Sequence, residues 1–135
     1  MSSHGITCRT ATVTADVVCK SVPGQILHVE SSTSRALDLW FNFGIKNQLI
    51  SLVALSREAA APQISAALAE VTSVIRRKAG PPVRTTGGGD AHTLGAGLLR
   101  QASSEFAFAD YYACARATNM GKDFMLTEEY RSLAN

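Results

Sequence analysis

The chain has 135 residues, enough to enclose one hydrophobic core and too few for two ordinary domains. Its 46% hydrophobic and 18% charged residues are typical of a folded globular protein. The formal net charge of +2 is close to neutral, which argues against bulk nucleic-acid binding. No apolar run approaches the roughly 20 residues that a membrane-spanning helix needs, so we expect no membrane span.

The first half of the chain predicts an antiparallel sheet of about four strands within residues 6–55. Residues that are β-branched or aromatic dominate this half, and turn residues such as Pro23 and Gly24 interrupt them. A two-residue apolar period then runs from Arg35 to Phe43. The expected strands cover residues 6–19, 25–30, 35–43 and 49–55.

The apolar period lengthens near Arg57, and the second half of the chain predicts helices. Pro62 suits the first turn of a helix that ends near Gly80. Its apolar stripe is Ile64, Leu68, Val71 and Ile75. A basic cluster in its last turn, where positive charge suits the helix dipole, is Arg76, Arg77 and Lys78.

Two further helices are expected after the first one. Thr93 is a suitable cap for a long helix, and Asn119 and Gly121 are suitable residues to end it. Its expected apolar stripe is Leu94, Leu98, Ala102, Phe106, Ala109, Ala113 and Ala117. A short terminal helix would begin at Thr127, with Glu128 and Glu129 in its first turn.

The expected fold class is therefore α+β, with the sheet packed against two or three helices within residues 62–133. One domain would span residues 1–135, with a strand-rich half over 1–56 and a helical half over 57–135.

The cysteines predict a reducing environment. Cys8, Cys19 and Cys114 are odd in number and lack Cys-x-x-Cys spacing, so we expect three free thiols and an intracellular protein. This reasoning does not distinguish the cytoplasm from an organelle matrix. The three histidines do not pair with the cysteines at metal-ligand spacings, so no metal site is expected.

A glycine-rich loop is the clearest sign of a binding site. Gly87, Gly88 and Gly89 leave backbone N–H groups uncovered, and the apolar run that follows predicts a helix start, where anions bind favourably. Arg84 lies just upstream and would neutralise the anion. The alternative interpretation is a flexible connector between two helices, in which Asp90 caps the second one.

The stretch from Pro82 to about Leu133 resembles the C-terminal region of the ribokinase-like (PfkB) sugar kinases. That family has a Thr-Thr-Gly-Ala-Gly-Asp loop that enters a helix, and this chain has Thr85-Thr86-Gly87-Gly88-Gly89-Asp90. By this resemblance, Asp90 would accept the proton of a substrate hydroxyl and the three glycines would bind the transferred phosphoryl group. ATP and magnesium would then be the cofactors. The sequence differs from the family at Arg84, His92 and Leu94, and the match covers about fifty residues.

Two functional hypotheses follow from the sequence. The first is a non-catalytic α+β protein, without a cofactor, that acts by protein–protein association as a subunit of a larger assembly. The second is a ribokinase-like phosphotransferase, or an anion-binding remnant of one, that uses the loop from Gly87 to Asp90. We favour the first, because one partial motif does not supply a complete kinase pocket.

Overall fold

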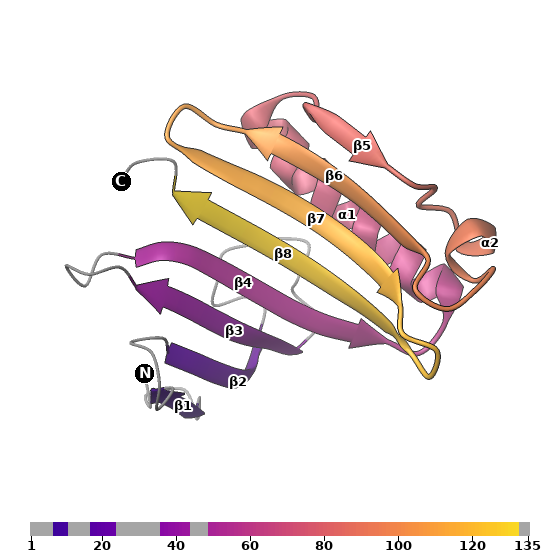
Figure 1. Ribbon diagram of the computed structural model, residues 1–135, viewed down its shortest axis with the longest axis horizontal. Helices are drawn as coiled ribbons and strands as arrows, with labels where there is room; N and C mark the ends of the chain where they lie inside the picture. Colours follow the sequence, from indigo (N-terminus) through magenta and orange to yellow (C-terminus); the bar gives the residue numbers. More distant parts are fainter. Residues whose placement is uncertain (1–6, 11–16, 24–35, 44–48, 133–135) are drawn as a thin grey trace.

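The molecule is built on one antiparallel sheet with a long helix on one face. The computed structural model describes residues 7–10, 17–23, 36–43 and 49–132. The elements are β1 (Thr7–Thr10), β2 (Val17–Pro23), β3 (Ala36–Phe43), β4 (Leu49–Glu58), α1 (Ala61–Ala79), β5 (Arg84–Thr86), α2 (Ala91–Leu94), β6 (Gln101–Ala107), β7 (Tyr111–Asn119) and β8 (Phe124–Ser132). The eight strands follow the order β1-β2-β3-β4-β8-β7-β6-β5 (Figure 1).

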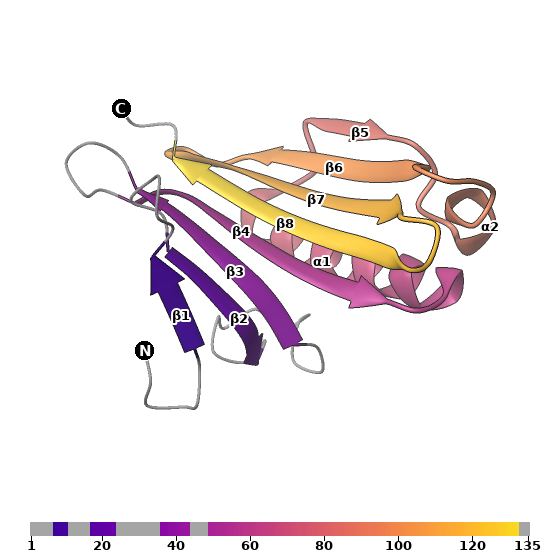
Figure 2. The same cartoon turned by 60° about the horizontal axis from the view of Figure 1, so that its bottom comes forward.

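Two four-stranded meanders make up this sheet. Strands β1 to β4 form the first and β5 to β8 form the second, and β4 joins them by pairing with β8. All seven pairings within the described residues are antiparallel. Helix α1 connects the two meanders and packs against β4, β6, β7 and β8, beneath the sheet in Figure 2.

The first half of the chain contains an antiparallel sheet, as predicted, but the single strand expected over residues 6–19 is wrong, because β1 and β2 are separate strands that pair with each other. Its described residues form four antiparallel strands, and β3 and β4 lie where the two-residue period and the apolar run predicted strands. The expected strand at 25–30 and the expected turn at 44–47 lie outside the described residues. The assignment of mixed α+β class is confirmed.

Helix α1 also forms as predicted. The apolar stripe of Ile64, Leu68, Val71 and Ile75 is buried against the sheet. The helix ends at Gly80, whose φ of 85° favours glycine, and the Gly80 N–H donates to the carbonyl of Arg76 at 2.8 Å. The basic cluster occupies the last turn, as expected.

The long helix predicted after Thr93 is wrong, because most of that segment forms β6 and β7. Within each of these strands the apolar residues on which the prediction rested recur at intervals of four, as from Ala102 to Phe106 and from Ala113 to Ala117. An interval of four keeps residues on one face of a helix and equally on one face of a strand. Alanine favours helices, so the alanines of this segment gave no reason to predict a strand. Ala102, Phe106, Ala113 and Ala117 are all buried against α1.

The short terminal helix is also wrong, because residues 124–132 form β8. Alternation within β8 places Leu126 and Glu128, which are 1% and 2% exposed, on the buried face. Gly121, with a φ of 90°, belongs to the turn that joins β7 to β8 and does not end a helix. The sheet therefore has eight strands where four were expected, and α2 is the only described helix besides α1.

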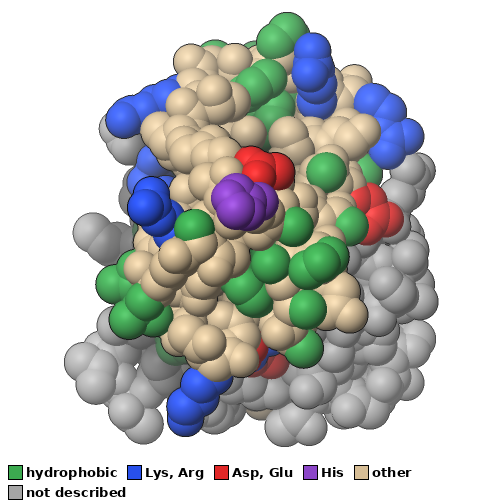
Figure 3. Space-filling view, turned by 90° about the vertical axis from the view of Figure 1, so that its right-hand side faces the viewer, with side chains coloured by type: hydrophobic (Ala, Val, Ile, Leu, Met, Phe, Trp, Pro, Cys, Tyr) green, Lys and Arg blue, Asp and Glu red, His purple; other side chains and the backbone are tan. Residues whose placement is uncertain are grey.

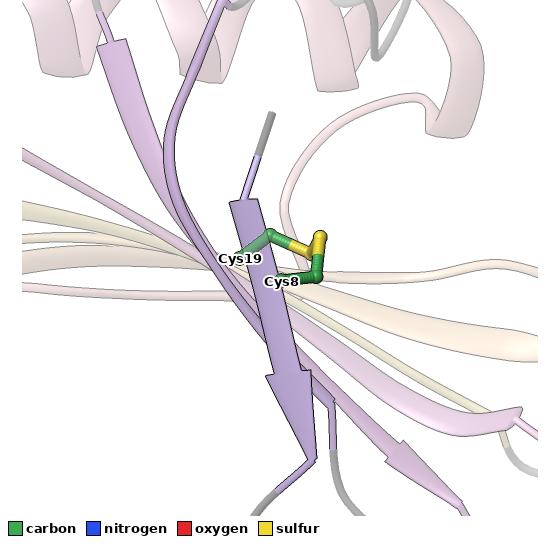
Figure 4. The surroundings of a disulfide bond; sticks show 2 residues. All are labelled: Cys8 and Cys19. Atoms are coloured by element: carbon green, nitrogen blue, oxygen red, sulfur yellow. A yellow bond between two sulfur atoms is a disulfide. The ribbon is translucent and has the colours of Figure 1, made fainter. Parts of the chain in front are cut away.

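The expectation of three free thiols is corrected by a disulfide between Cys8 and Cys19 (Figure 4). These residues are directly opposite each other on β1 and β2. Disulfides persist in oxidising compartments, so this bond points to an oxidising environment and not to the reducing one expected from the cysteine count. Cys114 is a free, buried thiol, as predicted.

Candidate functional site

The glycine-rich loop is held tightly between β6 and α1. Gly87 has a φ of 71°, and a Cβ added there would overlap the backbone carbonyl of Gln101. The Gly89 carbonyl accepts a hydrogen bond from the Ser65 hydroxyl at 2.6 Å. A Cβ on Gly89 would also lie 3.2 Å from the Leu68 side chain. Close packing therefore requires glycine at Gly87, whereas a methyl group at Gly89 needs only a small shift of the Leu68 side chain.

Asp90 caps α2. Its carboxylate accepts a hydrogen bond from the Thr93 N–H at 3.0 Å and another from the Thr93 hydroxyl at 2.7 Å. These hydrogen bonds, the hydroxyl first, lower the pKa of Asp90 below its ordinary value. The sequence offered Thr93 as the cap, or Asp90 if the loop is a connector, and the structure assigns the cap to Asp90. Asp90 itself is exposed.

Arg84 points away from the glycine loop. Its guanidinium lies 3.5 Å from the carboxylate of Glu105, which also accepts a hydrogen bond from the Tyr112 hydroxyl at 2.5 Å. Glu105 alternates along β6 with residues that pack on α1, so it belongs to the opposite face of the sheet. The structure therefore separates Arg84 from the groove that contains Gly89 and Asp90.

A groove of about 480 Å³ runs along α1 beside the end of the glycine loop. It is lined by Ser65, Leu68, Ala69, Thr72, Ser73, Arg76, Gly89 and Asp90. The cation that lines this groove is Arg76, in the last turn of α1 and at the far end of the groove from Gly89; sequence reasoning explained Arg76 by the helix dipole alone. A signal was present: Ser65, Thr72 and Arg76 follow one another at spacings of seven and four, which places them on one helix face.

A second feature lies at the α2 end of the sheet, where large apolar side chains are exposed (Figure 3). We call Leu98, Leu99 and Met120 the apolar tip; their exposed fractions are 68%, 62% and 38%. Leu99 has a φ of 63°, a conformation that leucine rarely adopts. Its N–H donates to the carbonyl of Asn119 at 2.8 Å, which fixes the chain in this conformation.

Asn119 connects the segments around the apolar tip. Its buried side-chain amide donates to the carbonyl of Leu94 at 3.0 Å and accepts from the N–H of Gly121 at 2.8 Å. Sequence reasoning missed the tip, because Leu94 and Leu98 fit one helical stripe. Only Leu94 is buried.

Cys114 is the free cysteine of the described residues, and it is buried. Burial raises the pKa of Cys114, which disfavours the nucleophilic thiolate. No group of three or more His, Cys, Asp or Glu residues in the described part of the chain is arranged to hold a metal ion.

Comparison of the chain with known protein families, with curated proteins and with solved structures finds no match. None of the helices within the described ranges is long and apolar enough to cross a membrane.

Proposed function

We propose that this protein is a non-catalytic subunit of a larger protein assembly and that it binds its partner through the apolar tip. The observation that carries this proposal is the exposure of Leu98 and Leu99, which are 68% and 62% accessible on neighbouring positions. Apolar side chains that lie together on the surface of a protein mark interaction sites, whereas single exposed apolar side chains do not. Full burial of a leucine contributes about 2 kcal/mol, so this pair supplies a substantial part of a binding free energy.

The conformation of Leu99 supports a functional role for the tip. A left-handed conformation costs a leucine about 1–2 kcal/mol, and glycine would avoid that cost. Exposure means that this cost is not offset by burial of the side chain in the core. The strain is instead held by hydrogen bonds around Asn119, as is common at binding sites. A prearranged tip loses little conformational entropy when it binds.

Charge around the tip indicates the character of the partner. Arg100 follows Leu99 directly and Lys122 follows Gly121, and both are exposed. The nearby carboxylate of Asp123 is 3.2 Å from the guanidinium of Arg57. The partner surface is therefore an apolar cleft with an acidic rim, because such a surface complements the tip. The Cys8–Cys19 disulfide supports an oxidising compartment as the place of assembly.

The test compares the size of the complex that contains this protein in its native source, before and after the tip is changed. Leu98→Ser and Leu99→Gly should each release the protein from the complex as a monomer. Leu99→Gly also removes the backbone strain, so it should leave the isolated protein at least as stable. Leu49→Ser is the control, since Leu49 is 49% exposed outside the tip.

A wild-type protein that is monomeric in its native source would contradict the proposal, as would tip variants that stay in the complex. The ribokinase-like alternative is tested with the same preparation. Phosphate transfer from ATP in the presence of magnesium, lost in Asp90→Asn, would replace the association proposal with a phosphotransferase.

A further inference from the structure

We propose that the β5 edge and the groove beside α1 bind an extended peptide as an added strand, with a carboxylate at the peptide's C-terminal end placed near Arg76. This surface is separate from the apolar tip, so the proposal does not depend on the partner that the tip binds. It assigns one occupant, a peptide of about five residues, to the groove that contains Gly89 and Asp90.

The β5 edge is open to a further strand. Strand β5 stands last in the sheet order, and all three of its residues are exposed. In an antiparallel ladder, alternate residues of an edge strand direct their N–H and C=O groups away from the sheet, where another chain can pair with them. All pairings of the described sheet are antiparallel, so we infer an antiparallel arrangement for the added strand.

The groove lies on the α1 side of the sheet. Half of the side chains of an added strand would point to that side. Thr86 shares a hydroxyl–hydroxyl hydrogen bond with Ser103, and Arg84 pairs with Glu105, both on the face away from α1. Thr85 lies between them, so its side chain is on the α1 side. Peptide side chains opposite Thr85 would enter the groove, where Leu68 supplies an apolar contact.

The direction of the peptide follows from the course of the chain. Ser65, near the start of α1, bonds to Gly89 at the end of the loop that follows β5, so β5 and α1 run in opposite directions. A strand antiparallel to β5 therefore runs in the same direction as α1. Its C-terminal end would lie at Arg76, and its N-terminal end would lie at Asp90.

Charge favours this same direction. The guanidinium of Arg76 attracts a carboxylate at one end of the groove, and Asp90, at the other end, is the single acidic residue among those that line it. The carboxylate of Asp90 repels a second carboxylate at the other end. The length fits too: the eleven steps along α1 from Ser65 to Arg76 rise about 16 Å, which about five residues of extended peptide span.

The experiment measures binding of pentapeptides by fluorescence polarisation. The probe is a synthetic library with a free C-terminal carboxylate and an apolar residue at the third position, and members should bind with micromolar dissociation constants. Arg76→Glu should weaken binding at least tenfold. Lys78→Glu is the matched control, with the same charge change in the same helical turn but outside the groove, and should change binding less than threefold.

Two chemical changes to the best-binding peptide test the remaining parts of the proposal. Amidation of the C-terminus should weaken binding at least tenfold, because it removes the terminal carboxylate that Arg76 attracts. Two series of the peptide carry methyl groups on alternate backbone nitrogens, one series on odd and one on even positions. Only one of the two sets of N–H groups donates to β5, so one series should lose binding and the other should keep it.

Three outcomes would overturn the inference: no library member binds, Arg76→Glu binds as well as the wild type, or both methylated series bind normally. Leu98→Ser should bind the peptide unchanged. Failure of the tip proposal and failure of the groove proposal can therefore be told apart.

Discussion

Gly87 lies so close to the backbone of Gln101 that a Cβ on Gly87 would overlap the Gln101 carbonyl oxygen. The φ of 71° at Gly87 adds a second reason for glycine at this position. The glycine therefore fixes where the chain leaves β5 and turns toward α2, which in turn places Gly89 and Asp90 beside α1.

Gly87→Ala should lower the free energy of unfolding by about 2 kcal/mol or more, because the backbone must shift to admit the methyl group. Urea unfolding measures this loss. Gly97→Ala is the matched control: a Cβ at Gly97 meets no atom within 4 Å, and its change in stability should be below about 0.5 kcal/mol. Equal effects at the two positions would contradict the role given to Gly87.

Asn119→Ala should destabilise the protein by about 1–3 kcal/mol, since it leaves the buried carbonyl of Leu94 without the Asn119 amide. The same change should speed amide hydrogen exchange at Leu99, whose N–H bonds to the backbone of residue 119. Gln101→Ala, at an exposed position, serves as the control. Unchanged exchange at Leu99 would show that the conformation of the tip does not depend on the Asn119 side chain.

Reduction of the Cys8–Cys19 disulfide should lower stability by about 3 kcal/mol, because the bond restricts the unfolded chain across a sequence separation of 11 residues. Thermal unfolding with and without a dithiol reductant measures the difference. Thiol titration of the denatured, unreduced protein should find one thiol, from Cys114, and three after reduction. Three thiols before reduction would contradict the disulfide.

The cap at Asp90 predicts a specific pH dependence. Hydrogen bonds from Thr93 lower the folded-state pKa of Asp90 below the unfolded value of about 3.9. The ionised carboxylate therefore stabilises the fold above that value, and this contribution is lost as pH falls through the folded-state pKa. Asp90→Asn keeps a cap that does not titrate, so the wild type should exceed the variant in melting temperature near pH 6 and lose that advantage toward pH 2.5. A constant difference across this range would contradict the assignment.

The sequence predicted an element correctly where the spacing of its apolar residues fits only one type of secondary structure. Along α1, Ile64, Leu68, Val71 and Ile75 recur at spacings of four, three and four, and the interval of three does not fit a strand. Within β6 and within β7 the intervals are all four, and the single interval of three, from Phe106 to Ala109, falls at the turn between the two strands, so the pattern could not separate helix from strand. The β6–β7 hairpin also lacked a signal, because its turn at Ala109 and Asp110 contains neither glycine nor proline.

The candidate site was predictable only where backbone geometry restricts residue type. Three consecutive glycines and Asp90 marked the loop, and the structure explains Gly87 by packing and Asp90 by capping. The place of Arg76 in the groove depends on how the loop after β5 packs along α1, and the exposure of Leu98 depends on where β6 begins. Both are consequences of tertiary pairing, which a local sequence pattern does not contain.

The two meanders of the sheet are joined by one strand pairing, that of β4 with β8. The six other pairings of the described sheet join consecutive strands, whereas Arg57 and Asp123, whose side chains form an ion pair at one end of this seam, are 66 residues apart. Hairpins close quickly, and distant segments find each other slowly. We therefore expect the slow step of folding to be the encounter between the two meanders after each has formed. Substitutions along the β4–β8 seam should slow refolding more than substitutions elsewhere that cost the same free energy of unfolding.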